Sequence, residues 1–215
     1  MNEYYSGLMS GISQTLIGYP FDTIIVHKQL NKSLKLKNIY RGIQYPLLTS
    51  SLISGISFGL NNNIYSVINN YYISGFISGI ITSFIINPVD LYKIRTQSNK
   101  KLNISINTGL KQTVIRESVA SSIYFGSYYS MRDRDIPVFI AGGLAGILSW
   151  IISFPLDTVK TRIQSGECTS ILDCLKKGRL YSGISICILR AGLVNSTGFY
   201  VFNHFQLDQR NNNKT

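Results

Sequence analysis

Pro20-Phe-Asp-Thr23, Pro88-Val-Asp-Leu91 and Pro155-Leu-Asp-Thr158 are three copies of one short motif, and their prolines lie 68 and 67 residues apart. Each copy is followed by a glutamine nine residues after its proline. These glutamines are Gln29, Gln97 and Gln164. One string that recurs at a fixed period indicates an internal repeat, and a repeat of this kind determines the fold.

Glycines keep the same register around every motif. A pair of glycines precedes each proline by thirteen and nine residues: Gly7 and Gly11, Gly75 and Gly79, Gly142 and Gly146. This G-x-x-x-G spacing in an apolar segment lets two helix backbones approach closely inside a membrane. A further glycine opens a second apolar stretch in each repeat: Gly42, Gly109 and Gly183. Each repeat therefore contains two apolar segments.

The composition favours a surface that faces lipid. Charged residues are 14% of the 215-residue chain and apolar residues are 45%, with a mean hydropathy of +0.12. Soluble chains use about a quarter charged residues, so this chain has too few to cover a water-facing surface. Its net charge of +11 suits anionic partners. Because the chain has no long Lys/Arg run, we expect a small charged solute and acidic lipid rather than a nucleic acid polymer.

The number of cysteines and histidines argues against a disulfide-stabilised fold and against a metal site. Three cysteines near the C-terminus form no disulfide framework, and with only two histidines they form no metal site. We expect a reduced compartment, no metal, no cofactor and no enzymatic activity.

Each repeat is predicted to form two membrane-spanning helices. The first helices are expected at 4–29, 72–97 and 138–164, and the second helices at 43–66, 110–132 and 184–206. Helices of this length cross about 30 Å of hydrocarbon with some tilt. The predicted fold class is an all-α membrane protein with six transmembrane helices in three pseudo-threefold two-helix repeats around a central cavity. The expected repeats cover 1–68, 69–135 and 136–207, and a polar tail follows at 208–215.

The prolines and acids of the motifs predict a closed end. Pro20, Pro88 and Pro155 are expected to kink the first helix of each repeat, so that the three helices converge. Two residues later each helix carries an acid: Asp22, Asp90 and Asp157. Charges at membrane depth face the interior and find partners.

Threefold symmetry predicts which bases pair with these acids. Lys93 and Lys160 lie five residues after their prolines, whereas the first copy has Ile25 at that place. Pairing between neighbouring helices gives Asp22–Lys93 and Asp90–Lys160. Asp157 is left unpaired or uses His27 or Lys28. Because desolvation largely offsets attraction in a buried ion pair, such a ring acts as a gate more than as a stabiliser. The alternative is a purely structural set of polar contacts.

P-x-D-x-x-K-x-R-x-Q in three repeats, each followed by a second helix, resembles the mitochondrial carrier family over essentially the whole chain. The resemblance implies a monomeric antiporter of the mitochondrial inner membrane that works by alternating access. It also implies that the gate of Asp22, Asp90, Asp157, Lys93 and Lys160 faces the matrix. The motif glutamines Gln29, Gln97 and Gln164 would brace it.

The chain departs from the family pattern at two places. The repeats are short, so the first two matrix-side amphipathic helices are expected to be trimmed, while the third survives at Ser170–Lys177. The acids of the family's second gate are replaced by Asn61-Asn62, Tyr128-Tyr129 and Phe202-Asn203. We therefore expect a weak cytoplasmic gate that is held by hydrogen bonds and packing.

The middle of the second helices predicts the solute. The positions nine residues before Phe58, Phe125 and Phe199 are Thr49, Arg116 and Arg190, and Glu117 follows Arg116. An arginine offers a fork of donors to a carboxylate or phosphate, and an adjacent carboxylate accepts from an ammonium group. Together they complement a zwitterion. An arginine followed by an acid at this place resembles the ornithine, carnitine and basic amino acid branch of the family.

Three alternatives to this site remain. In the first alternative, Arg116 and Glu117 pair only with each other and bind no solute. A nucleotide or deoxynucleotide carrier is the second, although Glu117 would repel a phosphate. The third is a carrier-like membrane adaptor that no longer transports.

The starts of two second helices are expected to bind lipid. Gly42 and Gly183 have aromatic residues nearby, and a helix start offers free N–H groups and a positive dipole end. The resemblance implies cardiolipin there. The alternative is a glycine that simply begins a helix.

Overall fold

The computed structural model describes residues 2–33, 39–101, 105–194 and 197, and these residues form helices and loops without a strand. The helices are α1 (Asn2–Gln29), α2 (Gln44–Ile68), α3 (Tyr71–Gln97), α4 (Leu110–Arg132), α5 (Val138–Gln164) and α6 (Ile171–Lys176). A further helix covers Ile184–Val194. The all-α fold is confirmed, and the first five predicted helices lie within two residues of their expected bounds. The rest of the sixth predicted helix, with Phe199, Phe202, Asn203 and the tail, lies outside the described residues.

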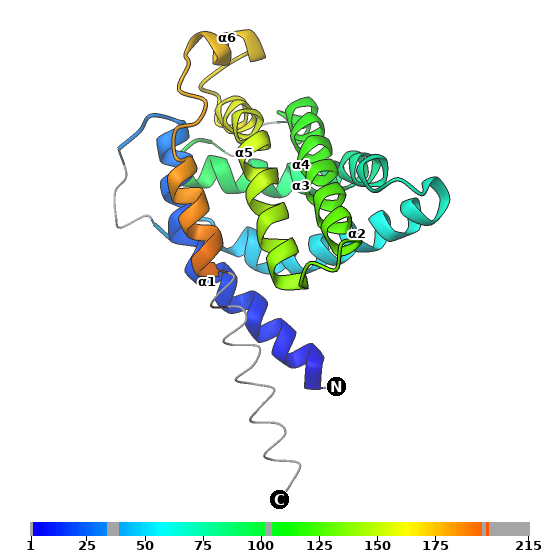
Figure 1. The fold of residues 1–215 in the computed structure, drawn as a ribbon. Coiled ribbons are helices and arrows are strands. Elements are labelled where there is room, and N and C mark those ends of the chain that lie inside the picture. The colour runs from blue at the N-terminus through cyan, green and yellow to red at the C-terminus, as the bar shows by residue number, and fades with distance from the viewer. Residues whose placement is uncertain (1, 34–38, 102–104, 195–196, 198–215) are drawn as a thin grey trace, which may run out of the picture.

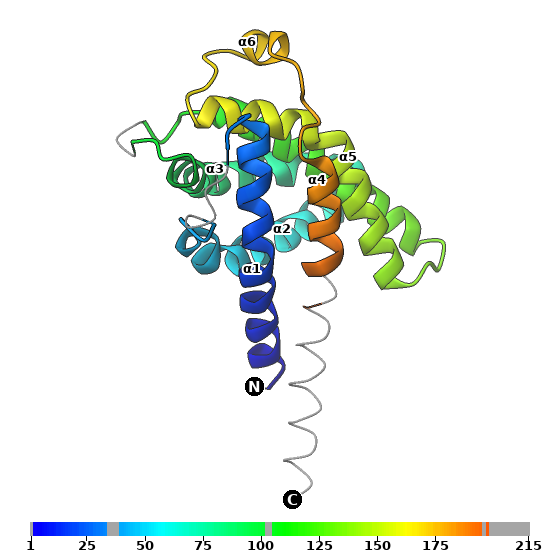
Figure 2. The same cartoon turned by 90° about the vertical axis from the view of Figure 1, so that its left-hand side faces the viewer.

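The chain closes on itself. α2, α3, α4 and α5 pack in the order of the sequence, each against the next. α1 lies beside the helix Ile184–Val194 in both views (Figures 1 and 2). These two helices are in close contact, because a Cβ atom on Gly18 would lie 2.9 Å from Val194. The first and third repeats are thus neighbours, and α6 lies at the end of the molecule where α1, α3 and α5 finish.

The helices α1, α3 and α5 continue through Pro20, Pro88 and Pro155. The ribbon of α5 changes direction part-way along its length (Figure 2). A proline inside a helix removes one backbone hydrogen bond, and this allows such a change of direction.

The glycine pair of the second repeat brings α3 against α4. A Cβ atom on Gly75 would lie 2.6 Å from Ser121 O, and one on Gly79 would lie 2.4 Å from Glu117 O. Both contacts are with backbone, which cannot move aside as a side chain can. In the third repeat, a Cβ atom on Gly142 or Gly146 would meet nothing within 4 Å among the described residues. The close packing expected of the G-x-x-x-G pairs is therefore present in the second repeat.

The second helix of every repeat begins in the same way. Gly42, Gly109 and Gly183 have φ angles of 90°, 76° and 103°, in the left-handed region that favours glycine. A polar side chain near each motif proline donates a hydrogen bond to the carbonyl three residues before that glycine. The bonds are Thr23 to Ile39 O at 2.7 Å, Asn87 to Ile106 O at 2.7 Å and Thr158 to Leu180 O at 2.6 Å. The repeat is thus visible in the backbone and its hydrogen bonds.

Polarity is inverted relative to a soluble protein. α3 buries a polar face, whose residues include Ser74, Ser78, Thr82, Ser83 and Asn87. Its opposite face exposes Phe76, Ile81, Phe84 and Ile85. α5 likewise buries Ser149 and Ser153 and exposes Leu144, Leu148 and Ile152. A soluble helix places its apolar stripe inward, so this arrangement suits an apolar solvent.

Two helices in the described part of the chain are both long and apolar enough to cross a membrane, Tyr71–Gln97 and Ile140–Gln164. Six such helices were expected. α1, α2 and α4 have 28, 25 and 23 residues, which at 1.5 Å per residue gives each at least about 34 Å of length. Their hydropathy is lowered by polar residues. Asp22 lies in α1, three asparagines lie in α2, and Arg116 and Glu117 lie in α4.

All three repeats meet at Glu167, in the loop after α5. Lys32 follows α1, and its Nζ lies 2.5 Å from Glu167 Oε1. Lys100 follows α3, and its Nζ lies 3.8 Å from the same oxygen. The hydrogen bond from Lys32 is the main cause that lowers the pKa of Glu167 below the ordinary value of a glutamate. This carboxylate therefore links the three loops when it is ionised.

We predict that stability depends on the charge of Glu167. A carboxyl group whose pKa is lowered by folding stabilises the folded state fully above its unfolded pKa of about 4.3, and this contribution is lost as the pH falls below that value through the lowered pKa of the folded state. Thermal unfolding of purified protein, followed between pH 7 and pH 3.5, should show a smaller fall for Glu167→Gln than for the wild type. An equal fall in both proteins would contradict this role.

We predict that Gly79→Ala prevents the packing of α3 on α4 and costs about 3 kcal/mol of stability, because the contacting atoms are backbone. The matched control is Gly59→Ala in α2, where a Cβ atom would meet nothing within 4 Å among the described residues. Thermal unfolding in detergent measures both variants. Equal melting temperatures would show that α3 and α4 do not depend on this close approach.

Candidate functional site

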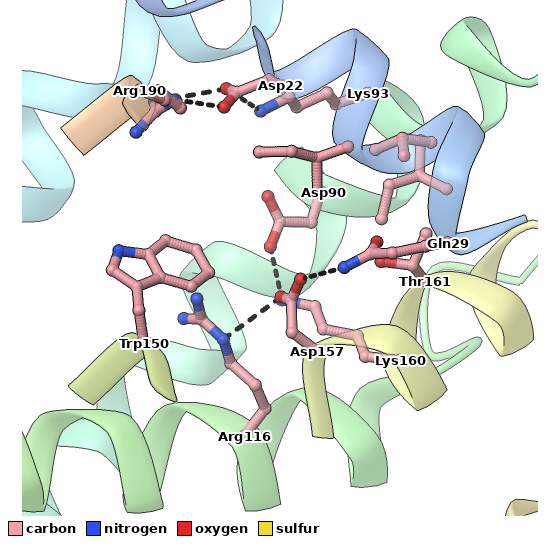
Figure 3. Close-up of a pocket in the computed structure, with 13 residues that line it drawn as sticks. Asp22, Gln29, Asp90, Lys93, Arg116, Trp150, Asp157, Lys160, Thr161 and Arg190 are labelled. Atoms are coloured by element: carbon pink, nitrogen blue, oxygen red, sulfur yellow. Dashed lines mark hydrogen bonds and ion pairs between the residues drawn. The ribbon is translucent and has the colours of Figure 1, made fainter. Parts of the chain in front are cut away.

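The acids and bases of the motifs line one internal cavity of about 200 Å³ between α1, α3, α4, α5 and the helix Ile184–Val194 (Figure 3). Its charged residues are Asp22, Asp90, Asp157, Lys93, Arg116, Lys160 and Arg190. They come from all three repeats. Sequence reasoning placed these residues in a gate and in a separate solute site, whereas the structure brings both sets into one cavity.

Two ion pairs join neighbouring repeats at the pairings that the motif spacing predicts. Lys93 Nζ lies 2.8 Å from Asp22 Oδ2, and Lys160 Nζ lies 2.5 Å from Asp90 Oδ2. The side chain of Lys160 is 2% exposed. An ammonium group at this depth requires a carboxylate, because an unpaired charge there is strongly unfavourable.

Asp157 has partners that the sequence did not predict. Its Oδ2 accepts a hydrogen bond of 2.9 Å from Gln29 Nε2, and its Oδ1 lies 3.3 Å from Arg116 Nε. The expectation that Asp157 is unpaired or uses His27 or Lys28 is therefore wrong. His27 Nδ1 instead lies 2.9 Å from Thr23 O of its own helix. Arg116 supplies the charge because its long side chain reaches across from α4 (Figure 3).

Arg190 contacts the acid of the first motif. Its Nε forms an ion pair with Asp22 Oδ1, and its Nη2 lies 3.4 Å from Asp22 Oδ2. Asp22 thus lies between Lys93 and Arg190. Both arginines expected to bind solute are therefore in contact with acids expected to form the gate.

Glu117 lies behind Arg116. Its Oε1 accepts a hydrogen bond of 2.7 Å from Arg116 Nη1 and lies 3.4 Å from Lys160 Nζ. The side chain is 8% exposed and does not line the cavity within the described part of the chain. The simple alternative of an Arg116–Glu117 pair is present, and each partner has a further contact. Glu117 is placed to orient Arg116, and a direct contact with solute would require it to move.

The cavity contains an arginine donor that is not fully used. Arg116 Nε is buried and has no aligned hydrogen-bond acceptor among the described residues, although it lies 3.3 Å from Asp157 Oδ1, whereas Arg190 Nε is in direct contact with Asp22 Oδ1. A buried donor of this kind is costly unless a ligand or a rearrangement satisfies it. Its position suits an incoming carboxylate.

Trp150 forms the wall beside Arg116. The guanidinium carbon of Arg116 lies 5.0 Å from the centroid of the indole ring, within cation–π distance. Trp150 was not among the site residues predicted from the sequence. The sequence feature that could have placed it in the site is its position seven residues before Asp157, two turns earlier on the same helix face.

Thr49 is not part of this cavity. Its hydroxyl donates a hydrogen bond of 2.7 Å to Tyr45 O in its own helix. Pro46 and Ser50 instead face a second cavity of about 440 Å³, which shares Asp22, Lys93 and Arg190 with the first. The first repeat therefore contributes a helix face that is rotated by one residue from the expected one.

The three motif glutamines have different partners. Only Gln29 donates to an acid of the ring. Gln97 Nε2 donates to Thr23 Oγ1 at 3.1 Å, and Gln164 Nε2 donates to Asn87 Oδ1 at 2.9 Å. The expectation that all three brace the ion pairs directly therefore differs from the structure. Gln97 and Gln164 instead connect neighbouring repeats beside the polar residues that position the second helices.

The C-terminal ends of α2 and α4 are joined by uncharged side chains. Tyr129 Oη donates a hydrogen bond of 2.9 Å to Asn62 Oδ1. Tyr65, Tyr71 and Tyr129 stack, with ring centroids 4.3 Å apart for the first pair and 5.0 Å for the second. Between these two repeats, the contacts at the expected second gate are therefore hydrogen bonds and ring packing.

We predict that Asp90→Asn is strongly destabilising because it leaves the buried Lys160 with the more distant Glu117 alone. Asp90 is partly exposed, so we expect the lower end of the usual cost for breaking a buried pair, about 3 kcal/mol. The double variant Asp90→Asn/Lys160→Met should regain most of this stability, because it removes both charges. Thermal unfolding in detergent measures all three proteins, and a double variant no better than Asp90→Asn would contradict the pairing.

Comparison with known families matches residues 135–210 to the mitochondrial carrier protein family. The mitochondrial arginine transporter BAC2 of Arabidopsis thaliana is 26% identical, with 93% of this chain and 88% of that protein covered. The mitochondrial basic amino acids transporter of Homo sapiens is 25% identical, with 92% and 87% covered. Mitochondrial ornithine transporter 1 of Schizosaccharomyces pombe is 25% identical, with 95% and 92% covered.

These alignments also agree with the short repeats. The alignment with the Arabidopsis thaliana protein spans 266 positions, more than the 215 residues of this chain. The relative therefore contains segments that this chain lacks. The chain is similar to these proteins over nearly its whole length, and the resemblance to the mitochondrial carrier family that its three motifs predicted is confirmed.

Proposed function

We propose that this protein is a transporter of the mitochondrial inner membrane that moves a basic amino acid, such as arginine, ornithine or lysine, by alternating access. In this proposal six transmembrane helices form three pseudo-threefold repeats around the charged cavity. The acids Asp22, Asp90 and Asp157 and the bases Lys93 and Lys160 form the matrix gate. The relatives named for arginine, basic amino acids and ornithine support this class of solute.

One observation carries the proposal: a charged cavity lies inside helices whose outer faces are apolar. Charged groups inside a membrane protein are expensive and mark the path of an ion or solute. A purely structural core would be more stable if it were filled with apolar residues. The collection of seven charged side chains from three repeats around about 200 Å³ therefore favours a site that binds and releases charged solute.

The chemistry of the cavity suits an amino acid with a cationic side chain. The α-carboxylate would accept hydrogen bonds from Arg116, whose Nε lacks an aligned acceptor among the described residues, or from Arg190, which would exchange Asp22 for it. The ammonium and side-chain cation would then contact the carboxylates that these arginines leave. A phosphate group would gain nothing from the second half of this exchange, because it offers no cation to the released acids.

Lipid contacts complete the proposal. Cardiolipin, an acidic lipid, would bind where the second helices of the first and third repeats begin, near Gly42 and Gly183. Tyr40 and Tyr181 are both exposed beside these glycines. Their rings would lie at the level of the lipid headgroups. A single copy of the chain would be sufficient for transport, because all three repeats needed for the cavity are present in it.

We predict that liposomes containing the purified protein take up labelled arginine, ornithine or lysine, and that internal unlabelled amino acid accelerates this uptake. Labelled dATP and carnitine are the comparison solutes. Uptake of dATP alone would show that the solute is a nucleotide and not an amino acid. Uptake of none of these solutes would favour a membrane adaptor.

Arg116→Ala and Arg190→Ala should each lower amino acid uptake by at least about tenfold, since each removes a charge-assisted hydrogen bond to the carboxylate. Arg134→Ala is the matched control, because Arg134 is an exposed arginine after α4. Uptake that is unchanged in both cavity variants would show that the solute binds elsewhere.

A further inference from the structure

The three motifs are not equivalent at one position. Five residues after the proline, the second and third repeats have Lys93 and Lys160, and both bases pair with an acid of the neighbouring repeat. The first repeat has Ile25 there. Ile25 is 7% exposed, lines the cavity and packs against Phe154 and Cys187. The first repeat therefore cannot supply the third base of the ring.

Asp157 lies where that missing base would reach. Gln29 is four residues after Ile25, one turn further on the same face of α1. Gln29 donates to Asp157 Oδ2 at 2.9 Å, so this face of α1 is directed at Asp157. The other carboxylate oxygen, Oδ1, is the one that lies 3.3 Å from Arg116 Nε. The cation beside Asp157 thus comes from the middle of α4 rather than from a motif.

We propose that Arg116 is the third cation of the gate and also the group that receives the carboxylate of the solute. In the other two repeats the motif lysines hold the ring. Here one side chain would do both tasks, so binding of solute would itself remove the partner of Asp157. The solute part of this inference rests on the proposed transport function, whereas the gate part rests on the contacts alone.

The contacts of Arg116 allow such an exchange of partners. Glu117 holds one end of the guanidinium at 2.7 Å, and Trp150 covers its face. These two contacts would keep the group in place. The ion pair with Asp157 is longer, at 3.3 Å, and lacks the alignment of a hydrogen bond. A solute carboxylate would therefore replace the longer of the two ion pairs of Arg116.

The exchange changes the partners of both Arg116 and Asp157. Arg116 keeps a carboxylate partner, and Asp157 keeps the amide of Gln29 and takes a cationic group of the solute as its new partner. The direct ion pair between α4 and α5 is thus replaced by contacts through a solute that can leave. The gate would then be weakest when solute is bound and strongest when the cavity is empty. This order of stabilities favours exchange over leakage through an empty carrier.

Protein stability tests the gate part without any transport. The melting temperature is measured in detergent for Arg116→Ala in the wild-type background and in the Ile25→Lys background, which restores a base to the first motif. We expect Arg116→Ala to lower the melting temperature by at least about 2 °C less in the Ile25→Lys background. Ile25→Met is the matched control, with similar length and no charge. An equal loss in all three backgrounds would overturn the proposal.

A second background covers the case in which Ile25→Lys does not fold. Asp157→Asn removes the charge that requires a cation, so Arg116→Ala should again cost less than in the wild type. If the cost were the same in Asp157→Asn, Arg116 would not act as the partner of Asp157, and the inference would be wrong.

Uptake of labelled arginine into liposomes tests the solute part. We expect Ile25→Lys to lower KM by at least about twofold, because Arg116 no longer has to leave Asp157, and to lower kcat, because binding no longer opens the third pair. An unchanged KM together with an unchanged kcat would overturn the double role. If the wild type took up no amino acid, the proposed function would fail, and the melting temperatures would still decide whether Arg116 belongs to the gate.

Discussion

Buried charge is the constraint on which the rest of the structure depends. Acids from three separate helices face one cavity, and each has to find a base or a strong donor there because its side chain is largely buried. The bases come from neighbouring repeats, so no repeat can satisfy its own acid. This requirement explains why α1, α3 and α5 converge. It also explains why the polar faces of the helices are directed inward and their apolar faces outward.

The glycines and small polar residues make this convergence possible. Close approach at Gly75 and Gly79 brings α4 against α3, and a larger residue at either position would push α4, which carries Arg116, away from α3. The left-handed glycines at the starts of the second helices, with their hydrogen bonds from Thr23, Asn87 and Thr158, set the depth of those helices. Packing and charge are therefore coupled: the arginine reaches Asp157 only because the backbones are close.

Much of the fold follows from the sequence because it depends on periodic, local features. The helix bounds, the repeat and the ion pairs Asp22–Lys93 and Asp90–Lys160 come from spacing alone. The partner of Asp157 could not be predicted in this way, because it depends on how far the Arg116 side chain reaches across the cavity. Ser50, rather than Thr49, lines the second cavity, because one residue along a helix turns the side chain by about 100°. The roles of Gln97 and Gln164 depend on which acceptor their flexible amides find, and the spacing does not specify this.

The two ends of the bundle differ in what can open them. At the proline end, the interactions between repeats are ionic, so a solute with charges of its own can exchange partners with them. At the other end, in the described part of the chain, Tyr129 donates to Asn62 and stacks with Tyr71, so the first two repeats are joined there by a neutral hydrogen bond and ring packing. The strength of these contacts does not depend on the charge of the solute. Among the described residues, the ion pairs inside the bundle that a charged solute could replace therefore lie at the proline end, where Arg116, Asp157 and Gln29 meet.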